Sequence, residues 1–415
     1  MNEKILKEDD FTLSSLLYIY KMNGKHASGA GVFYELDEPV DFQIMEKAYL
    51  KAIRRFPYYM VKMGTNDEKI YRIWVDEPNP LRQDPVDYLI NEKDNDGYLY
   101  RLSVNGNTVS FQFFHGISDG ISLNNFMKLL FKLYFEEKGE EVSMVTRFDI
   151  GQEVSEREYC DPLDEPAVCE VTPGSHERGT FYLLPEENNR DFRIFYFDCD
   201  AAKLMDIVRT SDGSPNTYMA ILLAESIAEV HPERDIEKIR VGITIDGKHF
   251  IGLSENHNPM LGISCFDYDK RAFSMDRTRL NTCVRGRLIL DCDDVNIIPQ
   301  IASPRKYLDY LKMMPTLAEK RGLSARTYIP VSTASISYVG KCDMGSIEKH
   351  LNHVYTFSYG DMPLLEINAV NGKFCFTFSS RADNICYMEK IREKIMEIGV
   401  ECTELKTMEF KEDRS

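Results

Sequence analysis

Residues 108–120 read TVSFQFFHGISDG, and residues 121–136, ISLNNFMKLLFKLYFE, follow directly. The first run, Thr108 to Phe114, is typical of a β-strand, and the second is amphipathic and ends before Gly139, as expected of a helix. Between them lies an HxxxDG pattern, His115 to Gly120. The stretch therefore predicts a histidine at the end of a strand, in a tight turn that leads into a helix.

The residue types in this turn suit proton transfer. An imidazole has an unperturbed pKa of about 6.5, so His115 can accept and return a proton near neutral pH. Gly116 and Gly120 permit close approach that a side chain would block. Asp119 would serve the imidazole directly, cap the following helix or pair with a basic side chain, and we favour the structural role. The alternative is a histidine beside a capping aspartate with no catalytic role.

The motif resembles that of the CoA-dependent acyltransferase superfamily, which includes chloramphenicol acetyltransferase, plant BAHD acyltransferases, alcohol O-acetyltransferases and nonribosomal peptide condensation domains. Further segments resemble the family in the same order along the chain: Ala48 to Pro57, which ends in RFP, Pro215 to Val230, Val241 to Lys248, and Ser335 to Lys341. The chain is most similar to the bacterial alcohol O-acetyltransferase-like group.

Two departures from the family pattern leave the acceptor open. Phe114 precedes His115, where chloramphenicol acetyltransferase and condensation domains usually have a second histidine. Lys248 stands where many relatives have an arginine that pairs with the motif aspartate. Since lysine lacks the bidentate geometry of arginine, a bridge between Asp119 and Lys248 is a hypothesis.

The resemblance implies an α/β (α+β) fold with two chloramphenicol-acetyltransferase-like halves. Each half is a mixed β-sheet flanked by helices, and a tunnel runs between the halves with His115 near its middle. We expect an N-terminal half over residues 1–160, which carries the motif, a crossover segment over 161–190, and a C-terminal half over 191–415.

The resemblance also implies the reaction. His115 would act as general base on the hydroxyl or amine of a small-molecule acceptor, without a covalent acyl-enzyme. The donor would be acyl-CoA, a co-substrate rather than a bound cofactor. Candidates for the oxyanion or the substrate are the Gly120 amide and the side chains of Ser335, Ser337, Asn258 and Lys248. Two alternatives remain: a condensation-like enzyme that uses acyl carrier protein thioesters, and a non-catalytic binding protein on the same fold.

Local patterns predict the surrounding elements. Asp41 caps a helix over residues 42–56, strands follow over Tyr58 to Met63 and Ile70 to Val75, Asn105-Gly106 turns a hairpin, and a helix spans Tyr307 to Arg321. The other histidines carry less weight. His249 and His257 lie in a polar loop, and loop polarity explains them better than a place in the lining of the tunnel. His350 and His353 lie three apart in an expected solvated helix. We predict no metal site.

Composition excludes several classes of function. The 415 residues are 43% hydrophobic and 28% charged, as in ordinary globular proteins, and the net charge of -17 argues against nucleic-acid binding. Ten cysteines without metal-ligand spacing are read as reduced thiols. There is no signal-like N-terminus and no apolar stretch that could span a membrane. We expect a cytoplasmic monomer or weak dimer.

Overall fold

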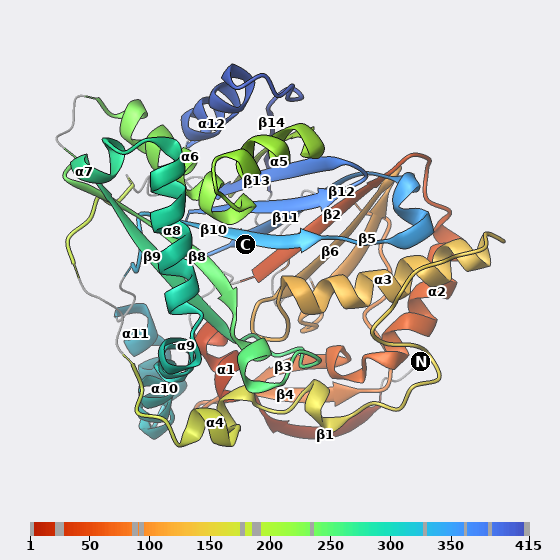
Figure 1. Ribbon diagram of the computed structural model, residues 1–415. Coiled ribbons are helices and arrows are strands. Elements are labelled where there is room, and N and C mark those ends of the chain that lie inside the picture. The colour runs from red at the N-terminus through yellow and green to blue at the C-terminus, as the bar shows by residue number, and fades with distance from the viewer. Residues whose placement is uncertain are drawn as a thin grey trace.

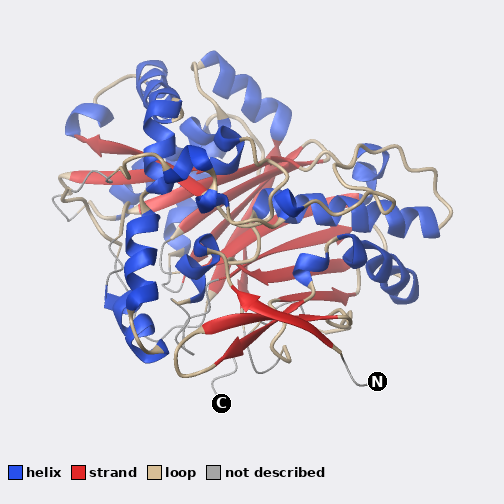
Figure 2. Cartoon of the chain, turned by 90° about the horizontal axis from the view of Figure 1, so that it is seen from below, coloured by secondary structure: helices blue, strands red, loops and turns tan. Residues whose placement is uncertain are grey.

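The computed structural model (Figure 1) describes residues 4–20, 29–84, 90, 95–174, 179–184, 192–232, 236–326, 330–360, 363–380 and 384–410. The described strands form sheets of seven, four and three strands. In the view from below, strands run through the middle of the molecule and helices gather on its outer sides (Figure 2). The architecture is therefore mixed α/β.

The seven-stranded sheet is built from the second half of the chain. Its order is β14-β7-β13-β12-β10-β8-β9, and β10 runs parallel to both β8 and β12 whereas the other neighbours are antiparallel. The strands are β7 (Arg193–Asp200), β8 (Lys238–Asp246), β9 (Leu261–Asp269), β10 (Ala334–Lys341), β12 (Leu364–Val370), β13 (Lys373–Ser380) and β14 (Lys406–Glu409).

Helices cover one face of this sheet. Their apolar side chains and those of the strands form one buried cluster. The helices are α5 (Ala201–Thr210), α6 (Pro215–Val230), α8 (Arg277–Asp291) and α12 (Ile385–Glu397). Short segments and further helices connect the rest of this half: η4 (Gly247–Ile251), α7 (Lys270–Phe273), α9 (Asp294–Ala302), α10 (Pro304–Met313), α11 (Leu317–Arg326) and η5 (Gly345–His350).

The four-stranded sheet is antiparallel, in the order β11-β2-β6-β5. It comprises β2 (Gly29–Leu36), β5 (Tyr100–Asn105), β6 (Thr108–Phe114) and β11 (Leu351–Tyr359). The strand β11 comes from the second half of the chain, yet it pairs with β2. The two halves therefore share a sheet, and the expected boundaries at 1–160, 161–190 and 191–415 stay a prediction.

The remaining elements belong to the first half and the crossover. A three-stranded sheet, β1-β4-β3, lies along the lower side of the molecule (Figure 1). Its strands are β1 (Ile5–Asp10), β3 (Val61–Thr65) and β4 (Ile70–Val75). The helical segments are α1 (Leu13–Ile19), α2 (Phe42–Arg55), η1 (Pro57–Tyr59), α3 (Gly120–Glu137), η2 (Glu156–Glu158), η3 (Pro162–Asp164) and α4 (Pro166–Cys169).

The pairing of β11 with β2 matches large side chains to glycines. Phe357 is the cross-strand partner of Gly31, and Tyr359 is that of Gly29. A Cβ atom on Gly31 would lie 2.4 Å from the Phe357 ring, and one on Gly29 would lie 2.3 Å from the Tyr359 ring. Only a residue without a side chain fits under each ring, so these two glycines allow β11 to dock.

Strand alternation gives the seven-stranded sheet a polar second face. In β12 and β13, Leu365, Ile367, Phe376 and Phe378 pack in the cluster with the helices. The intervening Glu366 and Asn368 point the other way, toward β11, where Asn368 Nδ2 donates to Thr356 Oγ1 over 2.8 Å and Ser358 Oγ donates to Glu366 Oε1 over 3.2 Å. The sheets therefore meet through a buried polar layer.

Several predicted elements need correction. The continuous helix over Tyr307 to Arg321 is wrong, because the chain leaves helical geometry before Pro315 and forms α10 and α11 instead. The solvated helix around His350 and His353 is also wrong: His350 ends η5, and His353 lies on β11. In contrast, the helix capped by Asp41 is confirmed as α2, and the strand over 108–114 is confirmed as β6.

We predict opposite effects of alanine at two glycines. Gly31→Ala should destabilise the protein by about 1–3 kcal/mol, because the new methyl group overlaps the Phe357 ring. Gly286→Ala should stabilise it by up to about 1 kcal/mol, because Gly286 lies within α8 and the added Cβ would meet no atom within 4 Å beyond its chain neighbours and the backbone of its own helix. Denaturant unfolding measures both changes. Equal effects of the two substitutions would contradict the proposed docking of β11.

We also predict that Glu366 lowers the free energy of unfolding as the pH rises. Burial raises the pKa of this carboxyl to about 8, although Ser358 and Ser379 favour its ionised form. The folded protein thus holds a proton that the unfolded chain releases, so this contribution to stability is lost as pH rises from about 4.5 to about 8. Glu366→Gln should be more stable than the unchanged protein near pH 8, and the difference should shrink toward pH 5. Parallel unfolding free energies across this range would refute the buried neutral acid.

Candidate active site

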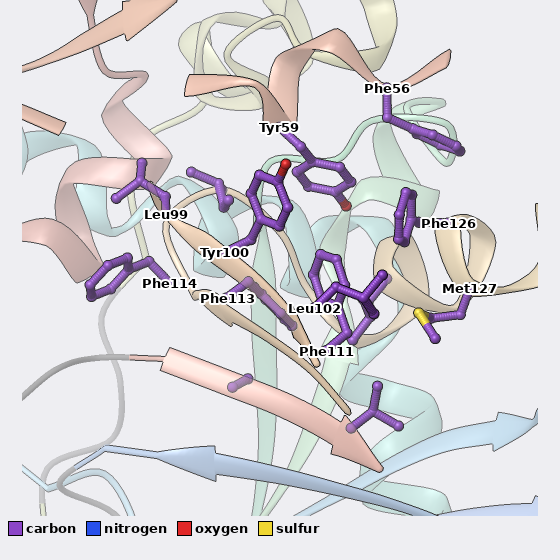
Figure 3. Packing of buried hydrophobic residues seen from close by; sticks show 14 of the residues in the cluster. Phe56, Tyr59, Leu99, Tyr100, Leu102, Phe111, Phe113, Phe114, Phe126 and Met127 are labelled. Carbon is purple, nitrogen blue, oxygen red and sulfur yellow. The ribbon is translucent and has the colours of Figure 1, made fainter. Parts of the chain in front are cut away.

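The strand β6, which ends at the motif turn, packs against a cluster of aromatic rings. Phe111 on β6 stacks on Tyr100 of β5, with ring centroids 5.6 Å apart, and lies 5.1 Å from the ring of Phe126 on α3. Figure 3 shows these rings and that of Tyr59 packed together between β5, β6 and α3. Because alternate residues of β6 enter this core, the end of the strand has a defined position and direction.

His115 follows β6 directly and is half-buried. Its ring stacks on Tyr18 of α1, with centroids 4.5 Å apart and an interplanar angle of 6°. A Cβ atom on the neighbouring Gly116 would lie 3.0 Å from Ser15 O and 3.0 Å from Ile19 Cγ1. The glycine thus lets the turn approach α1 closely enough for Tyr18 to hold the imidazole plane.

Asp119 is the N-cap of α3, as the sequence predicts. Its Oδ1 accepts a hydrogen bond from the Ser122 amide over 2.9 Å, so it satisfies one of the free N–H groups of the first helical turn. Its Oδ2 pairs with the Lys248 ammonium. The hypothesised bridge between Asp119 and Lys248 is therefore present, and it fixes the far end of the motif turn.

Lys248 is completely buried, and its ammonium has no N–H group left for a further hydrogen bond. Besides Asp119, its Nζ donates to Ser122 Oγ over 2.8 Å and to the Asn256 carbonyl over 2.9 Å. An ammonium has three donors, and all three meet protein acceptors. This saturation leaves Lys248 no N–H for a substrate oxyanion, so the structure supports a positioning role instead.

A chain of hydrogen bonds connects Ser118 of the motif to His257. Its Oγ lies 2.7 Å from Tyr59 Oη, which in turn lies 2.7 Å from His257 Nδ1. All three residues are buried, and burial followed by the charge of Lys248 lowers the pKa of His257 well below its ordinary value. His257 is therefore neutral at physiological pH and ties the motif turn to the loop after η4.

The loop that carries His257 is itself tied to η2. The His257 amide donates to the Glu158 carbonyl over 2.7 Å. The Glu158 carboxylate is buried and receives two hydrogen bonds from Arg55, of 2.8 and 2.9 Å. The bidentate pair holds η2 against α2, so η2 gives the loop of His257 a fixed support.

The other candidate residues have separate environments. Asn258 Nδ2 donates to the carbonyls of Tyr159 and Cys160 over 2.9 and 2.8 Å, which fits a structural tether. Ser335 is buried on β10, with its Oγ 3.0 Å from that of Ser332. Ser337 is half-buried on the same face of β10, opposite Glu366 of β12. Gly120 is the first residue of α3, and a Cβ atom there would only touch Val339 at 3.4 Å.

Sequence reasoning missed the tyrosines of the site. Tyr18 and Tyr59 contact the motif through ring stacking and a hydrogen bond, respectively. Residues 58–63 were predicted as a strand, but Tyr59 lies in η1 and the strand β3 begins at Val61. The sequence signal nearest to Tyr59 is the RFP segment of the family resemblance, which ends two residues before it.

Comparison with solved structures confirms the fold. The chain matches polyketide synthase associated protein 5 from Mycobacterium tuberculosis with a TM-score of 0.66 at 12% identity, covering 96% of this chain and 98% of that one. It matches TRI101 from F. sporotrichioides, complexed with coenzyme A and T-2, with a TM-score of 0.62 at 12% identity, covering 97% and 100%. The condensation domain of Monacolin K polyketide synthase MokA matches with a TM-score of 0.59 at 10% identity, covering 95% and 97%.

These similarities show that the chain shares its fold with TRI101 and with the MokA condensation domain, which agrees with the fold that the family resemblance implies. At identities of 10–12% they establish the fold alone. No family model matches the sequence, and no curated protein matches it. Among the described residues, no helix combines the length and hydrophobicity needed to cross a bilayer.

We predict that Lys248→Met destabilises the protein by about 3–5 kcal/mol, because it leaves the Asp119 carboxylate buried without a counter-charge. The double variant Lys248→Met with Asp119→Asn should recover part of this loss, since asparagine still caps α3 and carries no charge. Denaturant unfolding of the two single variants and the double variant gives the coupling free energy between the two side chains. If the two losses simply add, the side chains do not form the buried pair.

Proposed function

We propose that the protein is an acyltransferase that moves an acyl group from a thioester to a hydroxyl or amine of a small molecule. The observation that carries the proposal is the fixed and accessible position of the His115 side chain. Its half-buried imidazole lies at the end of β6, stacked on Tyr18, in a turn whose other end is held by Asp119 and Lys248. A general base requires this kind of fixed and accessible position.

In the proposed reaction, His115 takes the proton from the acceptor as its oxygen or nitrogen attacks the thioester carbonyl. The tetrahedral oxyanion then collapses, the C–S bond breaks, and His115 returns the proton to the leaving thiolate. No covalent acyl-enzyme forms. Lys248 and Asp119 act as positioning residues. The Gly120 amide and the Ser337 hydroxyl are the preferred oxyanion donors, because Ser335 already lies beside Ser332.

We propose acyl-CoA as the donor and co-substrate. The similarity to TRI101 supports this choice, because that structure was determined with coenzyme A. A chain with a net charge of -17 does not attract CoA from a distance, so binding requires a local basic surface.

The predicted tunnel between the halves is the proposed route for both substrates. A cytoplasmic monomer or weak dimer remains our proposal for the state of the protein.

The second candidate is a condensation-like enzyme that takes its acyl group from a carrier protein. The fold shared with the MokA condensation domain and with the epimerization domain of tyrocidine synthetase B favours it. The same His115 chemistry would apply, since a carrier protein also presents a thioester. A non-catalytic binding protein would keep the fold without turnover.

We predict that His115→Ala lowers turnover by about 10²–10⁴-fold while the fold remains intact, because the general base is lost. The measurement is free CoA, detected by mass spectrometry after incubation with mixed acyl-CoAs and a pool of small alcohols and amines. His249→Ala is the matched control, because His249 is exposed on η4 outside the motif.

CoA release that requires both His115 and an acceptor would establish the acyltransferase. A folded His115→Ala variant with unchanged turnover would overturn the mechanism. A folded protein that is silent with every acyl-CoA, but releases thiol from an acylated carrier protein, would establish the condensation-like alternative.

A further inference from the structure

Three strands bring an aspartate, a histidine and a cysteine together away from the motif. Asp198 on β7 and Cys375 on β13 are direct cross-strand partners. Their neighbours Phe197 and Phe376 pack in the cluster with the helices, so Asp198 and Cys375 lie on the opposite face of the sheet. On that face β11 supplies His353, whose ring meets the Asp198 carboxylate.

The geometry of this group is compact. His353 Nδ1 lies 2.5 Å from Asp198 Oδ2, and one ligand atom from each of the three residues lies within 4.8 Å of the other two. Asp198 Oδ2 is fully buried, and it lacks a properly oriented hydrogen-bond donor among the residues that the structure describes. A buried carboxylate oxygen that is directed at a histidine nitrogen and a thiol is a feature of metal-ligand sets.

We propose that Asp198, His353 and Cys375 form a binding site for a divalent transition metal ion, with zinc as the preferred ion. Carboxylate oxygen, imidazole nitrogen and thiolate sulfur are the three ligand types that zinc takes in proteins. Zinc–ligand bonds of about 2.0–2.3 Å at tetrahedral angles separate neighbouring ligand atoms by about 3.3–3.8 Å. The 2.5 Å between His353 Nδ1 and Asp198 Oδ2 is about 1 Å shorter than this spacing, so these two side chains would move apart when the ion binds.

The charge balance is favourable. Binding converts the Cys375 thiol to a thiolate and releases one proton to solvent, so the thiolate and the Asp198 carboxylate together neutralise the ion. Lys373 Nζ lies 3.8 Å from Asp198 Oδ2, and Glu35, the cross-strand partner of His353, adds a nearby negative charge.

The site has one accessible side. Asp198 and Cys375 are buried, whereas the His353 side chain is 19% exposed and that of Lys373 is 37% exposed. An ion would enter past His353. Three protein ligands leave the fourth position to a water molecule, and Tyr355 Oη, 3.5 Å from His353 Nδ1, is close enough to hold that water.

The expected role of the ion is to hold two sheets together. His353 belongs to β11, which pairs with β2 in the four-stranded sheet, whereas Asp198 and Cys375 belong to the seven-stranded sheet. A bound ion would therefore cross-link the two sheets and stabilise their packing. This role does not depend on the proposed acyltransferase activity.

The test uses the full chain, freed of metal with a chelator and titrated with Co²⁺ and then with Zn²⁺. We expect one equivalent of Co²⁺ to give a thiolate charge-transfer absorption, which Zn²⁺ abolishes by displacement. Cys375→Ser should lose this absorption and weaken Zn²⁺ binding by more than about tenfold. The control Cys265→Ser should bind as the unchanged protein does, because Cys265 lies on β9 at the far edge of the sheet.

A second variant keeps the proposal falsifiable if Cys375→Ser does not fold. His353→Gln changes a partly exposed residue, and it should abolish both the Co²⁺ absorption and the rise in melting temperature that Zn²⁺ gives the unchanged protein. The proposal is overturned if the metal-free protein shows no thiolate absorption with Co²⁺, or if the absorption survives in folded His353→Gln or disappears in Cys265→Ser.

Discussion

The buried pair of Asp119 and Lys248 is the constraint on which the arrangement around His115 depends. Both residues are removed from solvent, so each charge loses its hydration. The pair compensates through direct contact and through the hydrogen bonds from Lys248 to Ser122 and Asn256. Since Asp119 begins α3 and Lys248 follows β8, the turn that holds His115 takes its position only when the two halves of the chain are packed together.

The packing of the halves rests on a second constraint, the insertion of β11 beside β2. Phe357 and Tyr359 lie over glycines of the neighbouring strand, so the strands approach closely without overlap. The strand β11 also makes polar contacts, including the hydrogen bond between Asn368 and Thr356 and the contact between His353 and Asp198. Buried polar groups favour one register over its alternatives, because a shifted strand would leave them unsatisfied.

Sequence reasoning located the elements whose signals are local. The boundaries of β4 and β6 and the cap of α2 follow from short-range alternation and from Asp41. It failed where a local pattern is ambiguous: Tyr58 to Met63 resembles a strand but begins in η1, and the apolar spacing between Tyr307 and Arg321 continues through Pro315 although the helix does not. The motif positions of the site were predictable, but Tyr18 and Tyr59 were not, because their contacts depend on elements far away in the chain.

By itself, the sequence determined that a histidine would end a strand and that an aspartate would begin the following helix, because turn and capping preferences act over a few residues. The family resemblance added Lys248 as a hypothetical partner for Asp119. Only the tertiary structure decided that the two meet across 129 positions of sequence, that Ser118 reaches His257 through Tyr59, and that His353 joins Asp198 and Cys375. Contacts of this range depend on how sheets and helices pack, and local preferences leave that packing open.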